Sequence, residues 1–191
     1  MTAVTILRRG LDLALAALVA AVVVVGLTAY LAPAVHGRAL AIRSGSMAPA
    51  IGVGSLVVVL PQDPATLAVG DVVTIKLDAG TVLTHRIAEV VQQDDRRMFR
   101  LRGDANPAPD PVLATQDQLM GRVVVALPVL GFLLALMSMP SGIVALLSFG
   151  GLLLMAAWLV DDVAAEQADR RARRRRTTLI DVGYDVAPEP R

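Results

Sequence analysis

Two long stretches without a charged residue constrain this chain more than any other feature, because each has to be kept away from water. Residues 13–32 are twenty residues with no Asp, Glu, Lys or Arg, and residues 129–160 are 32 such residues. At about 1.5 Å per helical residue, twenty residues cover the roughly 30 Å hydrocarbon core of a bilayer. The sequence therefore predicts two transmembrane helices, one over 13–34 and one within 129–160.

A cleaved secretory signal is the rival interpretation of the first stretch. Arg8 and Arg9 precede it, and the Ala-Pro-Ala of residues 32–34 is similar to a small-residue cleavage site. However, the uncharged run exceeds the roughly 7–15 residues that are usual for the apolar part of a signal peptide, and Pro33 lies inside the would-be site. We therefore interpret the first stretch as an uncleaved membrane anchor.

The second stretch is longer than one perpendicular span needs, and it contains a helix-start signal. Pro140 precedes twenty uncharged residues, 141–160, and proline is favoured at the first position of a helix. Residues 129–139 are too few to cross alone. We expect them to form an apolar surface that lies on or dips into the bilayer; a re-entrant hairpin is the alternative.

Basic residues near both ends set the expected topology. Six of the seven residues 170–176 are arginine, and Arg8 and Arg9 lie before the first span. Because arginine-rich flanks stay on the cytoplasmic side, residues 1–12 and 161–191 are predicted to be cytoplasmic and residues 35–128 extracytoplasmic. The arginine cluster could also hold anionic lipid head groups. The tail 161–191, and above all 177–191, has little to bury and is expected to be disordered.

Between the two spans, short apolar runs alternate with turn residues and show no helical period. Residues 78–80, Asp-Ala-Gly, predict a turn that joins two strands into a hairpin. The sequence thus predicts a small, mostly β domain over 35–128, held between two transmembrane helices. Its expected strands cover residues 56–60, 72–77, 81–91, 98–102 and 122–127.

Composition excludes several classes of chemistry. The net charge of +1 gives no basic field for nucleic acid, and the absence of cysteine removes disulfides, thiolate nucleophiles and zinc–thiolate sites. No metal-ligand spacing occurs, and we expect no cofactor. With two histidines and one lysine in the chain, the candidate general bases are His36, His85 and Lys76.

Residues 44–49, Ser-Gly-Ser-Met-Ala-Pro, place small hydroxyl residues in a turn close behind the first span. Ser46 is followed along the chain by His85, Asp104 and Asp110, which are the residue types of a nucleophile, a base and an orienting carboxylate. A serine is a weak nucleophile until a base takes its proton, and a carboxylate fixes the tautomer of an imidazole base. By pattern alone, however, His85 shares a strand face with apolar neighbours and is typical of a core histidine.

Four blocks in order resemble the type I signal peptidases, within them the archaeal and endoplasmic-reticulum branch. They are the serine block at 44–49, Gly-Asp-Val-Val at 70–73, Thr-His-Arg-Ile at 84–87, and Gly-Asp-Ala-Asn with a later Pro-Asp over 103–110. The third block holds histidine where the common bacterial branch has lysine. Ala50 departs from the family pattern, which usually has threonine or serine after the proline.

The resemblance implies a membrane-bound serine endopeptidase that removes signal peptides from secretory precursors after small residues. Ser46 would attack, His85 would act as base and then acid, and Asp104 or Asp110 would orient it; the sequence does not choose between them, although we favour a helper or structural role for Asp110. The Ser46 N–H and the Ser44 hydroxyl would hold the oxyanion. The substrate would add as a strand between two segments, Ala41, Ile42 and Arg43 on one side and Val82, Leu83 and Thr84 on the other.

Other interpretations stay open at this point. A two-span membrane protein whose outer β domain binds an envelope partner would use the serine block as a structural turn only. A self-cleaving serine protease of the repressor type is a weaker option, and Lys76 is the one candidate for a Ser-Lys dyad. His36 is interpreted as an interfacial residue, and Asp71 as a structural residue that caps the turn into its strand.

Overall fold

The computed structural model describes residues 3–77, 80–93 and 96–184. The chain forms two compact units. One is Ala20–Val144 and holds the β domain; the other combines Met1–Val19 with Ala145–Arg191. Each unit is described by itself.

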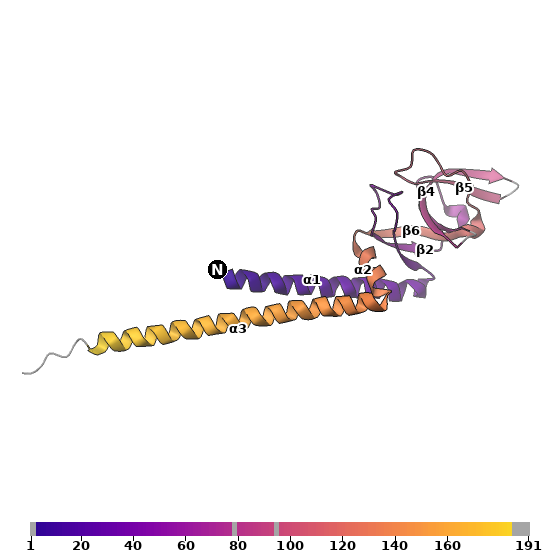
Figure 1. The fold of residues 1–191 in the computed structure, drawn as a ribbon. Helices are drawn as coiled ribbons and strands as arrows, with labels where there is room; N and C mark the ends of the chain where they lie inside the picture. The colour runs from indigo at the N-terminus through magenta and orange to yellow at the C-terminus, as the bar shows by residue number, and fades with distance from the viewer. Residues whose placement is uncertain (1–2, 78–79, 94–95, 185–191) are drawn as a thin grey trace, which may run out of the picture. The chain divides into compact units, whose positions relative to one another are not determined.

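Most of the two uncharged stretches lies in two long helices. Helix α1 spans Ala3–Leu31 and helix α3 spans Pro140–Tyr184 (Figure 1). Both contain segments long and apolar enough to cross a membrane. Arg8 of α1 donates to Asp12 at 2.7 Å and forms an ion pair with Asp161 of α3 at 2.9 Å. Helix α3 begins at Pro140, one residue before the predicted start at 141, whereas α1 begins well before the predicted residue 13.

The prediction of a disordered tail is wrong for residues 161–184, because α3 continues without a break to Tyr184. Alanine, glutamate, glutamine and arginine are strong helix formers and make up most of residues 164–176. Arg170 also donates to Glu166 at 2.7 Å, a favourable spacing of one helical turn. We predicted disorder because these residues have little apolar surface to bury, but their high helix propensity is enough to form a helix. The rest of the tail, 185–191, lies outside the described residues.

The run 129–139 forms a separate short helix, α2, which spans Leu130–Met137. It packs against the first two strands of the sheet. The 3₁₀ helix η1, Ala32–Val35, follows α1 and leads into the first strand. Exposed apolar side chains remain on α2, notably Phe132 at 56% exposed.

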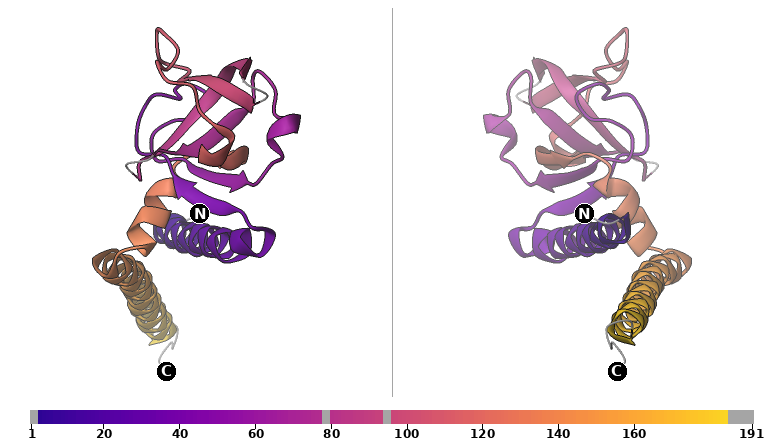
Figure 2. Two further views of the ribbon diagram at one scale, coloured as in Figure 1. Left: turned by 90° about the vertical axis from the view of Figure 1, so that its right-hand side faces the viewer. Right: turned by 90° about the vertical axis from the view of Figure 1, so that its left-hand side faces the viewer.

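The β domain is one six-stranded antiparallel sheet in the order β1-β2-β6-β3-β4-β5. Register shifts in β2–β6, β3–β6 and β4–β5 pairing bend the strands, and Figure 2 shows the resulting strongly curved sheet from two sides. The strands are β1 (Arg38–Ala41), β2 (Leu56–Leu60), β3 (Val72–Lys76), β4 (Val82–Gln93), β5 (Arg96–Arg102) and β6 (Leu119–Leu127).

The expected fold class is confirmed: in chain order, a mostly β domain lies between two helices that could cross a membrane. All five expected strands are present, with ends that shift by a few residues. Strand β1 was not predicted, because four residues with mixed polarity carry no clear period. Of the predicted hairpin turn, Asp78 and Ala79 lie outside the described residues.

Two apolar clusters form the core of the sheet. The larger one contains Leu67, Val73, Ile75, Ile87, Phe99, Leu101 and Ala114. The smaller one contains Met47, Ile51, Val57 and Val59. Met47 thus ties the serine block directly to the core, since its side chain is only 1% exposed.

Candidate active site

Ser46 lies in a tight turn after β1. The Ala48 N–H donates to Gly45 O at 3.0 Å, and the Ile51 N–H donates to Met47 O at 2.8 Å. Met47 is buried in the smaller core cluster, and Ser46 beside it is half-buried. The buried methionine therefore anchors the turn and holds the serine hydroxyl at the margin of the domain.

The two serines of the block lie side by side. Ser44 Oγ and Ser46 Oγ are 3.3 Å apart, beyond the roughly 2.5–3.0 Å of a strong hydroxyl hydrogen bond. Ser44 is exposed, whereas Ser46 is half-buried. Because this bond is weak, both hydroxyls can turn toward a bound ligand at little cost.

His85 lies on β4, opposite Val73 of β3, with its side chain 5% exposed. Its Nδ1 is 2.6 Å from Asp110 Oδ2. Its Nε2 is buried and makes no hydrogen bond with any residue that the structure describes. When Nδ1 carries the proton that binds a carboxylate, Nε2 is left as the acceptor. The arrangement therefore presents an oriented imidazole with one free basic nitrogen.

Among the described residues, Asp104 hydrogen-bonds to Arg86, whereas the carboxylate that meets His85 is that of Asp110, for which we had favoured a helper or structural role. Arg86 donates from Nε and Nη2 to the two oxygens of Asp104, at 2.8 and 2.7 Å. Neighbouring residues on a strand point to opposite faces. Arg86 therefore binds Asp104 on one face of β4, and His85 binds Asp110 on the other. The Arg86 hydrogen bonds hold the pKa of Asp104 below its usual range, and they raise the pKa of Arg86.

The lowered pKa of Asp104 predicts a stability effect that depends on pH. Because the folded pKa lies below the unfolded value of about 3.9, the ion pair stabilises the fold above that pH and loses its effect as the pH falls through the folded pKa. Arg86 is 37% exposed, so solvent screens the pair and we expect Asp104→Asn to cost only about 1 kcal/mol at pH 7. The difference from wild type should shrink at pH 2–3 in thermal unfolding followed by circular dichroism.

The matched control for this variant is Glu89→Gln, which breaks the surface pair between Glu89 and Arg100. Glu89 is 59% exposed, so this change should cost less than about 0.5 kcal/mol at either pH. An Asp104→Asn deficit that stays constant between pH 7 and pH 3 would contradict the role of the charged pair.

The loop 103–110 joins the serine turn to the histidine. The Ala105 N–H donates to Ser46 O at 2.8 Å. A Cβ on Gly103 would lie 2.6 Å from the same carbonyl, so only glycine allows this close approach. At the other end of the loop, Asp110 binds His85. The loop thus connects the serine block at 44–49 with the histidine block at 84–87. The described residues nevertheless show no hydrogen bond between Ser46 Oγ and His85 Nε2.

The two predicted substrate segments lie at open strand edges. Residues 82–86 of β4 pair with β3 on one side, whereas β5 pairs only from Arg86 onward. Among the described strands, residues 82–85 therefore lack a partner on their second edge. The backbone N–H and C=O of Ile42 form hydrogen bonds with Ser55 and Gly54. Because backbone groups alternate in direction along an extended strand, the N–H and C=O groups of Ala41 and Arg43 point outward.

Comparison with known proteins supports the resemblance to type I signal peptidases. No protein-family model matches the chain. Signal peptidase I W of Bacillus subtilis (strain 168) is 44% identical over 80 residues, which are 41% of this chain. The chain is similar to a type I signal peptidase. The match spans 42% of the relative's length, so it concerns less than half of either protein.

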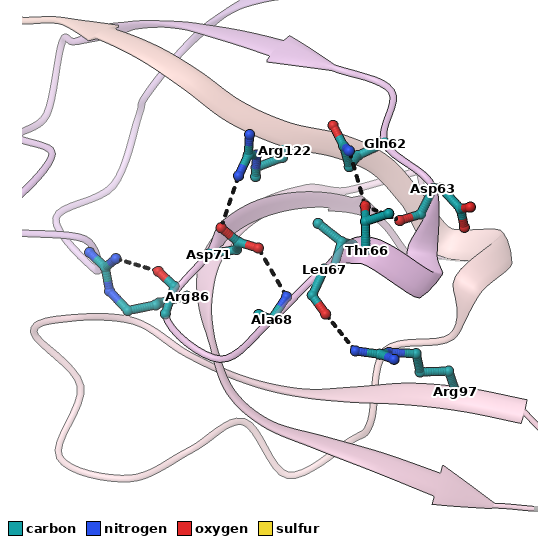
Figure 3. A network of polar contacts seen from close by, with 10 residues as sticks. Gln62, Asp63, Thr66, Leu67, Ala68, Asp71, Arg86, Arg97 and Arg122 are labelled. Carbon is teal, nitrogen blue, oxygen red and sulfur yellow. Dashed lines mark hydrogen bonds and ion pairs between the residues drawn. The ribbon is translucent and has the colours of Figure 1, made fainter.

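Three residues considered in the sequence analysis remain, and none of them is hydrogen-bonded to His85 or Asp110 in the described part of the chain. Lys76 is exposed at the end of β3, and His36 is exposed at the end of η1. Asp71 accepts from the Ala68 N–H at 3.0 Å and from Arg122 at 3.2 Å (Figure 3), which agrees with a structural role. The described residues contain no group of three His, Cys, Asp or Glu side chains that could hold a metal ion.

Sequence reasoning missed the arginines of this region. Arg86 binds Gly70 O at 2.8 Å as well as Asp104, and Arg122 binds Asp71 (Figure 3). An arginine beside the histidine in the third block was a usable signal, because its planar donors match a carboxylate.

Proposed function

We propose that this protein is a membrane-bound serine endopeptidase that removes signal peptides from secretory precursors and cuts after small residues. The observation that carries the proposal is the His85 imidazole, which is buried and bound to Asp110 through Nδ1, while its Nε2 has no hydrogen-bond partner among the described residues. The similarity to a type I signal peptidase supports the same activity.

The proposed reaction assigns one role to each polar group. His85 Nε2 takes the proton of Ser46 as Oγ forms a bond to the scissile carbonyl carbon, and the carbonyl oxygen becomes negative. The proton then passes to the leaving amine as the peptide C–N bond breaks. Water hydrolyses the acyl-enzyme with His85 as base again. Asp110 keeps the imidazole in its tautomer and stabilises the imidazolium.

The oxyanion is held by the Ser46 N–H and the Ser44 hydroxyl in this proposal. The 3.3 Å separation of the two hydroxyl oxygens supports it, because Ser44 lies beside the attacking atom and is weakly engaged. One such donor contributes about 3–4 kcal/mol to transition-state stabilisation in serine proteases.

Substrate binds as an added strand between the edges at Ala41–Arg43 and Val82–Thr84. The open second edge of residues 82–85 supports this mode, since an extended peptide can make main-chain hydrogen bonds there. Leu83 shares the face of His85, which would place the scissile bond next to the base.

The membrane arrangement is also a proposal. We assign α1 and α3 as two spans, with residues 1–12 and 161–191 cytoplasmic and 35–128 on the outer face, on the basis of their apolar length and the flanking arginines. Residues 129–139 would contact the bilayer surface, as exposed Phe132 of α2 and exposed Met139 just after it suggest. The histidine in the third block supports the archaeal and endoplasmic-reticulum branch.

The test is cleavage of a precursor by the purified full chain in detergent or liposomes. A precursor with alanine one and three residues before the cut should be cleaved at that bond, as mass spectrometry of the products would show. A matched precursor with tryptophan one residue before the cut should stay intact, because the proposed specificity for small residues excludes a bulky side chain. A non-enzymatic envelope-binding protein would leave both precursors whole, which would refute the proposal.

A further inference from the structure

The short helix α2 approaches the β domain through backbone rather than side chains. The Gly131 N–H donates to Gly54 O at 2.8 Å. Gly131 is buried, and a Cβ there would overlap the carbonyl of Ser55. Any residue other than glycine at 131 would therefore push α2 away from residues 54–55.

Residues 54–55 transmit this contact to the proposed substrate edge. Gly54 has φ +80° and lies under the ring of Phe132, where a Cβ would overlap the ring. The same residues also bind Ile42: the Gly54 N–H donates to Ile42 O at 2.8 Å, and the Ile42 N–H donates to Ser55 O at 2.9 Å. The same two residues thus bind both α2 and Ile42, which lies two positions before Ser44.

The far end of α2 meets the last turns of α1. A Cβ on Gly26 would lie 3.6 Å from Cε of Met137, which is ordinary van der Waals contact. Val25 next to it is fully buried. Within the unit Ala20–Val144, α2 therefore lies between the end of α1 and residues 54–55.

We infer that α2 positions the edge at Ala41–Arg43, and that Gly131 is the positioning residue. This inference rests on the proposed function, because it assigns α2 the task of fixing the register in which the substrate strand binds. Gly131 does not touch the substrate; it acts through Gly54, Ser55 and Ile42. A shift of α2 moves Ile42, and with it the backbone groups that hold the substrate strand.

The decisive variant is Gly131→Ala in the full chain. Alanine is the better helix former, so α2 itself is not weakened and the change acts through the overlap with Ser55. We expect KM for the precursor to rise about tenfold while kcat changes less than about threefold, with new cleavage sites one or two residues from the original. Hydrogen exchange should speed up over residues 38–57 and stay unchanged over 82–93.

Gly150→Ala is the matched control, because Gly150 of α3 has nothing within 4 Å of its Cβ position. It should leave KM, the cleavage site and exchange unaltered. Phe132→Ala is a second test that adds no overlap: it removes the ring over Gly54 and should give a smaller change of the same kind. It decides the matter if Gly131→Ala does not fold.

The outcomes separate this inference from the proposed function. A wild-type chain that cleaves no precursor refutes the proposed peptidase activity. Hydrogen exchange over residues 38–57 would still show whether α2 stabilises residues 54–55 and Ile42. Unchanged exchange there in both variants overturns the positioning role of α2. Faster exchange with an unaltered KM and cleavage site overturns it as well, because α2 would then only stabilise the fold.

Discussion

Ser46→Ala should abolish precursor cleavage and leave the fold intact. Removal of a serine nucleophile lowers kcat by about 10⁴-fold or more in serine proteases. Ser46 is half-buried, and within the described part of the chain its hydroxyl forms one weak hydrogen bond, with Ser44. Its loss should therefore change the free energy of unfolding by less than about 0.5 kcal/mol. Quantitative product analysis and thermal unfolding in detergent measure the two effects.

Ser44→Ala is the informative companion to this variant. Ser44 and Ser46 share the same turn, but the proposed role of Ser44 is to stabilise the oxyanion. Its replacement should lower kcat by about 10²–10³-fold and change KM little. Undiminished cleavage by the Ser46 variant would rule out the proposed nucleophile, and an effect of Ser44→Ala confined to KM would assign Ser44 to substrate binding instead.

Asp110→Asn is expected to have the second largest effect. An amide in place of the carboxylate can offer its N–H₂ to Nδ1 and favour the wrong tautomer of His85, and the equivalent change in a Ser-His-Asp protease lowers kcat by about 10⁴-fold. The 2.6 Å contact between His85 Nδ1 and Asp110 Oδ2 is the basis for this value. Steady-state kinetics on a cleavable precursor give the measurement.

Asp104→Asn is the matched control, since it makes the same chemical change in the same loop. In the described residues, Asp104 hydrogen-bonds to Arg86, whereas His85 hydrogen-bonds to Asp110. We therefore expect Asp104→Asn to lower kcat less than about tenfold, because Asp104 would support the loop only indirectly. If the two variants lost activity equally while both stayed folded, Asp110 would not be the particular partner of His85.

The architecture was accessible from the sequence because it depends on long-range patterns. Two uncharged runs predict the helices α1 and α3, and alternating short runs predict five of the six strands. The short strand β1 has no such pattern, and its place beside β2 is set by tertiary pairing of Arg38–Ala41. The helical tail was missed because burial was weighed above the helix propensity of Ala, Glu and Arg.

For the candidate site, the residue types could be predicted from the sequence, whereas the contacts between them could not. Sequence order supplied Ser46, His85 and two aspartates, but it could not show which carboxylate meets the imidazole. That choice depends on Arg86, which binds Asp104 from the opposite face of β4. The roles of Gly54 and Gly131 were equally invisible, since a close backbone approach appears only once the chain is folded.

The unbroken course of α3 fixes how far its arginines lie from its apolar part. Arg170 lies nine positions after Asp161, which in a helix corresponds to about 14 Å. The range of electrostatic attraction at physiological ionic strength is only about 8 Å. The head-group layer extends about 5–7 Å beyond the hydrocarbon on each side. If α3 stands upright in a membrane, Arg170 therefore lies within about one screening length of that layer, whereas the arginines farther along α3 lie beyond it and are attracted only weakly.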